Sequence, residues 1–268
     1  MQPKWINALN TQPAECTILS DVWYGSRCVP HLAVLLAFFV ALRQQLESCS
    51  QLRHTLREHI EYHNLFSLYT YVATEFATAL RPCLIPPVNT QTVDARFTLF
   101  VVADKDSTFT EERVSVLPPT VQTLLRDVQK QANPSILTRL RTSSRFDTKG
   151  LQKLDGPLIF FVDPETKLIH PLEPSRITQL LDHYPSLRAL WPFPPNVHRH
   201  YMRSRLFNHE HIDFDFELIN FFMGHKHFCH EPFHSQAWSD MPLAYHILSE
   251  QLELCLSEIG IIPLRFQP

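Results

Sequence analysis

His200 and Arg203 are the side chains of this sequence whose types and spacing best fit chemistry on a phosphate group. Residues three apart on a helix share a face, so this histidine and this arginine would point the same way. The planar guanidinium of arginine can bind two phosphate oxygens at once, and histidine transfers protons near neutral pH. His-x-x-Arg arises often by chance in a chain with 15 histidines, so the pattern needs support from other residues.

Cleavage of a phosphodiester bond requires more groups than this one histidine and one arginine. Breaking a DNA strand without a metal ion requires a nucleophile, cations that neutralise the phosphate oxygens, and a general acid for the leaving 5′ oxygen. Arg81 ends a predicted helix, Lys105 lies in a predicted turn, and His225 follows Gly224. Each also has an ordinary interpretation: Arg81 as a cation at a helix C-terminus, Lys105 as a turn lysine, and the histidines as core or surface residues.

The order of these residues resembles the catalytic domain of the tyrosine recombinase family, the phage-integrase-like enzymes. Thr78-Ala79-Leu80-Arg81-Pro82 is similar to the segment in which a helix ends at the first catalytic arginine. Lys105 and the strand Arg113-Val114-Ser115-Val116-Leu117-Pro118 resemble the family's β-hairpin lysine and the strand after it. His200-Tyr201-Met202-Arg203 matches its His-x-x-Arg box, and Met223-Gly224-His225 matches the box that follows. Four elements in the right order are more specific than any one alone.

The resemblance extends from about His54 to Leu264. It implies a divergent, mobile-element recombinase that acts on a DNA phosphodiester through a covalent protein-phosphate intermediate. It also implies five residues that act on the scissile phosphate: Arg81 and Arg203 binding it, Lys105 protonating the leaving oxygen, His200 assisting proton transfer, and His225 donating a hydrogen bond.

The nucleophile departs from the family pattern. The family places a tyrosine about nine residues past the Gly-His histidine, and this sequence has His234 there. Tyr245 is the only tyrosine further on, and it would serve if an insertion displaces it. Histidine can also attack phosphorus. We place Tyr245 slightly ahead of His234, and both could instead be structural. The alternative function is therefore a catalytically inactive DNA-binding or assembly module of a mobile element that keeps the recombinase fold.

Metal and nucleotide cofactors have little support in the sequence. His225-Lys226-His227-Phe228-Cys229-His230, with His234, offers the imidazole and thiolate groups that zinc prefers, but no second cysteine cluster completes a site. Neither GxGxxG nor GxxxxGK[ST] occurs. We expect a reaction without a metal ion or a nucleotide cofactor.

Hydrophobic periodicity and proline positions predict a mainly α protein with a small antiparallel β-hairpin or three-stranded sheet. Prolines would start or stop several helices. The expected helices cover residues 31–46, 52–79, 118–128, 176–183, 213–223 and 242–259, with one more running from Asn196 through Arg203, and the expected strands cover 96–102, 112–117 and 157–162.

Two units are expected along the chain: a helical appendage over residues 1–50, a possible remnant of a DNA-clamping domain, and an integrase-like catalytic domain over residues 51–268. The apolar run 32–42 is too short to span a bilayer and is predicted to be a buried helix. The six cysteines are spread singly, which favours reduced thiols and a cytoplasmic protein.

Charge is distributed unevenly, although the net charge is only -3. Residues 139–205 hold eleven Lys or Arg against six Asp or Glu, a balance of +5, whereas residues 206–268 hold two against nine, a balance of -7. A basic segment beside an acidic tail suits a protein that binds phosphates with one face and docks its tail on protein, although ordinary solvated faces would give the same charges. The expected partners are double-stranded DNA, further copies of the chain through the C-terminal segment, and accessory proteins of the same element, with no membrane.

Overall fold

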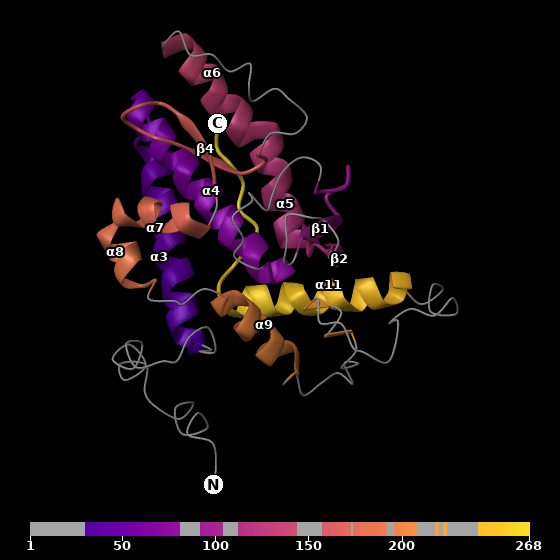
Figure 1. Ribbon diagram of the computed structural model, residues 1–268. Helices are drawn as coiled ribbons and strands as arrows, with labels where there is room; N and C mark the ends of the chain where they lie inside the picture. Colours follow the sequence, from indigo (N-terminus) through magenta and orange to yellow (C-terminus); the bar gives the residue numbers. More distant parts are fainter. Residues whose placement is uncertain are drawn as a thin grey trace.

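The computed structural model describes residues 30–80, 92–103, 112–143, 157–172, 174–191, 196–207, 218–219, 222–223 and 241–268. These residues form mostly helices, with two small antiparallel sheets (Figure 1). The predicted mainly α fold with a small hairpin is confirmed at this level.

Helix α4 (Leu56–Thr78) is the centre of the described core. Its N-terminus is closed by a capping box, in which Glu58 N donates to Thr55 Oγ1 at 3.3 Å and Thr55 N donates to Glu58 Oε2 at 2.7 Å. Every residue from Tyr62 to Thr78 is buried, so the other elements surround this helix. Helix α3 (Leu32–Gln51) lies along it and contributes five buried side chains to the same core: Leu35, Phe38, Phe39, Leu42 and Leu46.

The apolar run at residues 32–42 belongs to a longer helix than predicted, since α3 continues to Gln51. By length and composition alone, this 20-residue helix could cross a membrane, and it is the one described helix that passes this test. Core helices of soluble proteins and signal sequences near an N-terminus pass the same test.

The β-hairpin was correctly predicted. Strands β1 (Leu99–Ala103) and β2 (Glu112–Val116) pair antiparallel, with Leu99 opposite Val116. The third expected strand does not join them. Instead, β3 (Phe160–Val162) pairs with β4 (Ile169–Pro171), because the Asp163 carboxylate accepts backbone N–H bonds from residues 165 and 166 and reverses the chain.

The helix predicted to end at Val128 continues much further. Helix α5 (Pro119–Asp127) passes through one π-helical turn, η3 (Val128–Ala132), into α6 (Asn133–Ser143). Pro134 has no N–H to donate into the regular α pattern, so the wider turn before it has a clear local cause. The helix therefore continues past this proline to Ser143.

The second half of the chain adds further helices to those described above. It contains α7 (Pro174–Asp182), α8 (Pro185–Ala189), α9 (Val197–Phe207) and α11 (Met241–Glu258). Helices α9 and α11 both contact α4 and each other near its end (Figure 1). Most of the helix predicted over residues 213–223 lies outside the described residues.

Candidate functional site

The C-terminal end of α4 is the point at which the described parts of the motif segments meet. Its C-cap residue, Ala79, has a left-handed backbone with φ of 48°. This conformation costs an alanine about 1 kcal/mol, so surrounding contacts must hold it. The carbonyl groups of Thr78, Ala79 and Leu80 have no partners within the helix, and side chains from two other elements donate to them.

Arg113 reaches this helix end from strand β2. Its Nη2 donates to Thr78 O at 2.6 Å and to Ala79 O at 3.2 Å, and the residue is buried. The guanidinium also lies 5.9 Å from the centroid of the Phe222 ring. A cation at the negative end of a helix is favourable. The hairpin that leads to Lys105 is thereby joined to the helix end that leads to Arg81.

Arg199, in the first turn of α9, joins two segments that are distant in sequence. Its Nη1 donates to Ala79 O, and its Nη2 donates to Met223 O at 2.7 Å. Ala79 lies two residues before Arg81 in the sequence, and Met223 lies two residues before His225. The side chain is only 5% exposed. Ala79 O thus accepts from two guanidinium groups, those of Arg113 and Arg199.

His198 completes the contacts with the helix end. Its Nε2 is hydrogen-bonded to Leu80 O, and because a carbonyl oxygen only accepts, the proton must be on Nε2. Burial lowers the pKa of His198 to about 3, and the neighbouring Arg199 and His200 lower it as well. His198 is therefore a neutral donor that fixes α9 at Leu80, immediately before Arg81.

Helix α9 presents the two predicted site residues on its less buried side. His200 is half-buried and Arg203 is exposed, one turn apart on this helix. The far end of the helix is fixed by Arg205, whose Nε and Nη2 donate to the Glu258 carboxylate of α11 at 2.6 and 2.7 Å. The helix that carries His200 and Arg203 is therefore held at both ends.

Tyr245 lies in α11 and is half-buried. Burial raises the pKa of its phenol, which favours the neutral hydroxyl over the phenolate. Arg81, Lys105, His225 and His234 lie outside the described residues. The structure therefore brings together the described segments that adjoin Arg81, Lys105 and His225 in the sequence. It describes His200, Arg203 and Tyr245 themselves.

No family model matches the chain, and no match was found among curated proteins or among solved structures.

Metal ligands do not gather in the part of the chain that the structure describes, where no group of three or more His, Cys, Asp or Glu side chains could hold an ion. The histidine-rich segment at residues 225–230 lies outside it.

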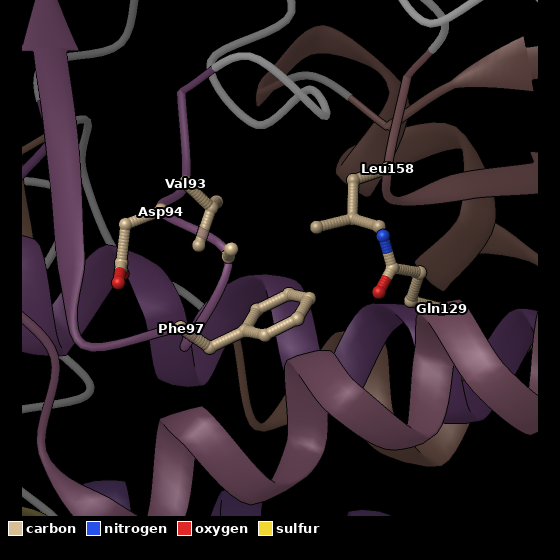
Figure 2. A pocket seen from close by; sticks show the side chains of 6 residues that line it. Val93, Asp94, Phe97, Gln129 and Leu158 are labelled. Atoms are coloured by element: carbon tan, nitrogen blue, oxygen red, sulfur yellow. The ribbon is translucent and has the colours of Figure 1, made fainter.

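A separate cavity of about 290 Å³ lies between the loop before β1 and the π-helical turn (Figure 2). Its one charged lining residue, Asp94, accepts hydrogen bonds from the backbone N–H groups of Arg96, Thr98 and Leu99. This carboxylate therefore organises its own loop, which gives the cavity a structural explanation.

The roles of His198 and Arg199 were not predicted from the sequence. His198 lies four residues before Met202 and eight before Leu206, so its place on the apolar stripe of α9 was a readable sign of burial. Arg199 offered no comparable sign, since its partners are backbone carbonyls of residues 79 and 223. Because every residue has a backbone carbonyl, the residue types at positions 79 and 223 do not indicate that an arginine bonds there.

Proposed function

We propose that the chain is a site-specific DNA recombinase of the integrase type, which acts on a phosphodiester bond through a covalent protein-phosphate intermediate. We also propose that the helices and the β1–β2 hairpin form the catalytic-domain fold of tyrosine recombinases. One observation carries the proposal: Arg113 and Arg199 join the end of α4, strand β2, α9 and Met223 at one place. Each of these elements contains or adjoins one of the four sequence motifs that resemble tyrosine recombinases.

The proposed reaction has one nucleophile and one leaving group. Tyr245, or His234 in its place, attacks phosphorus, and the bond between phosphorus and the 5′ oxygen breaks. His200 takes part in moving the proton of the nucleophile, and Lys105 gives a proton to the leaving 5′ oxygen. The product is a DNA 3′ end linked to the protein and a free 5′ hydroxyl.

Cations would stabilise the charge that develops on the phosphate during this step. Arg81 and Arg203 are the proposed phosphate ligands, and His225 is a proposed hydrogen-bond donor. An arginine suits this role because its N–H groups are fixed in one plane and its charge persists at all working pH values. The exposed position of Arg203 leaves it accessible to a DNA strand.

A second candidate, a binding or assembly module that does not cleave DNA, is favoured by the environment of Tyr245. A nucleophilic tyrosine gains from a lowered pKa, whereas burial raises the pKa of this one. The two candidates share partners and differ only in the chemical step.

A suicide DNA substrate, nicked so that the released piece diffuses away, separates the two candidates. The enzyme gives a covalent protein-DNA adduct on the ends of its own element, and the adduct is lost in Tyr245→Phe or, failing that, in His234→Ala. Tyr184→Phe is the matched control, because Tyr184 lies outside the motif segments, and it keeps the adduct. Binding of the same DNA without any adduct rejects the enzyme and supports the binding module.

A further inference from the structure

Arg199 joins two distant segments of the chain and has no role among those proposed so far. It is a buried arginine of α9 whose two terminal nitrogens donate to different segments, at Ala79 O and Met223 O. Arg203, one turn further along the same helix, is exposed. The resemblance gives a role to Arg203 and none to Arg199.

We propose that Arg199 is a positioning residue of the recombinase reaction, which fixes the relative placement of the chain at Ala79 and at Met223. This inference rests on the proposed function. Arg81 and His225 each follow one of these anchor residues by two positions in the sequence. A single guanidinium that bonds both anchors sets how far apart the two segments can lie.

The planarity of the guanidinium explains why an arginine is needed at this position. Its N–H groups point in fixed directions, so two bonds from one group fix both distance and orientation. An ammonium group is a point charge on a flexible stem, and it cannot bridge the same two carbonyls in the same geometry. Lysine at position 199 would keep the charge and lose the bridge.

The neighbouring contacts make this bridge rigid. Arg113 also donates to Ala79 O, and His198 bonds Leu80 O, so the first anchor is held from both β2 and α9. Arg205 fixes the other end of α9 to Glu258. A displacement of about 1 Å at a reacting group can lower a rate by about 100-fold. Loss of the bridge should therefore reduce the rate more than it reduces DNA binding.

The test compares Arg199→Lys with Arg188→Lys in the full chain. Each substitution removes a guanidinium that donates to two different residues, but only the first touches the anchors, because Arg188 of α8 donates to Asp182 and to Trp191 O. On the suicide substrate at saturating DNA, we expect R199K to form adduct about 100-fold more slowly than the unsubstituted chain, with a Kd for DNA within threefold. R188K, compared at equal folded fraction, keeps the adduct rate within threefold.

A double substitution separates positioning from direct contact with the phosphate. A positioning residue acts through Arg81 and His225, so the defect of R199K becomes smaller in a chain that already carries Arg81→Ala. The defect of a variant that lost an independent phosphate ligand stays the same in that background. A defect of R199K that is equal in the two backgrounds overturns the positioning role.

Other outcomes also decide the matter. If R199K does not fold, Arg199→Gln is the second variant, because its amide still donates without a charge. An adduct rate within threefold of the unsubstituted chain in either folded variant rejects the inference while the proposed function stands. If neither variant folds where R188K does, Arg199 maintains the fold and the positioning role is rejected. If the unsubstituted chain forms no adduct, the proposed function fails first and this inference fails with it.

Discussion

Arg113 of β2 donates through Nη2 to the carbonyl oxygen of Thr78, the last residue of α4, at 2.6 Å. A helix usually ends on a glycine or on nearby donors of its own segment. Here the donor comes from a strand 35 residues away in sequence, and the C-cap is an alanine with a left-handed backbone. The end of α4 is therefore stable only when the hairpin and α9 are in place.

Arg113→Met should destabilise the protein markedly. The substitution keeps most of the aliphatic stem and removes the charged donor from Thr78 O and Ala79 O. Hydrogen bonds from charged groups contribute about 1.5–3 kcal/mol each, so we expect the free energy of unfolding to fall by about 2–4 kcal/mol. Urea denaturation measures this change. Arg188→Met is the control, since Arg188 forms an exposed ion pair with Asp182, and it should change stability by less than about 0.5 kcal/mol. Equal effects of the two substitutions would contradict this account.

The secondary structure of the described residues was largely predictable because it depends on local signals. Hydrophobic spacing located α4 and α11, and β-rich runs on either side of a polar turn located the β1–β2 hairpin. The boundaries were less predictable. The helix expected to end at Val128 continues through a π-helical turn and past Pro134 to Ser143.

The geometry of the site was less predictable, for a physical reason. A pattern such as His200-x-x-Arg203 can be read from residue types, because its members share one helix face. The contacts of Arg199 and His198 are with backbone oxygens, which every residue carries. Only the folded chain shows that Ala79 and Met223 lie within reach of one guanidinium.

Glu75 should make stability depend on pH near neutrality. Burial raises the pKa of this carboxyl to about 8, although a hydrogen bond from Tyr71 lowers it in part. Between the unfolded pKa of about 4.5 and pH 8, the folded chain holds a proton that the unfolded chain releases, so stability falls as pH rises through this range. Glu75→Gln stays neutral, and its stability relative to the unsubstituted chain should rise from pH 4.5 to pH 8.

The opposite slope is expected for Glu58→Gln. Hydrogen bonds from Thr55 and His54 lower the pKa of the Glu58 carboxyl, so it contributes stability above its unfolded pKa and loses it as pH falls. Urea denaturation at several pH values measures the stability of E75Q and of E58Q relative to the unsubstituted chain. A difference for E75Q that does not change with pH would show that Glu75 ionises normally in the folded chain.

His198 should make the end of α4 sensitive to acid. Its pKa is lowered to about 3, so below pH 6.5 the unfolded chain takes up a proton that the folded chain does not. Stability from this residue is complete above pH 6.5 and declines as pH falls. His198→Gln keeps a neutral donor for Leu80 O, and we expect it to lose less stability than the unsubstituted chain between pH 6.5 and pH 4. Parallel pH curves for the two proteins would show that His198 becomes charged without disturbing the fold.

Phe266 ties the C-terminal residues to the core of their own chain. Its ring lies 4.9 Å from the Tyr62 ring and 5.3 Å from the Phe66 ring, and its backbone N–H donates to Asp127 at 2.9 Å. Removing a buried phenylalanine costs about 3–5 kcal/mol, so Phe266→Ala should lower the free energy of unfolding by at least about 3 kcal/mol. Phe207→Ala, at a side chain 63% exposed, should change it by less than about 0.5 kcal/mol.

The same tail contact bears on assembly, because the C-terminal segment is the part expected to join copies of the chain. With Phe266 packed on α4 of its own chain, the loss in Phe266→Ala should not depend on protein concentration in the absence of DNA. Chemical denaturation at concentrations 100-fold apart measures this directly. If the fall in the free energy of unfolding caused by Phe266→Ala grows with protein concentration, the C-terminal residues of one copy pack on α4 of another copy. The contact of Phe266 with its own chain is then exchanged between copies in solution.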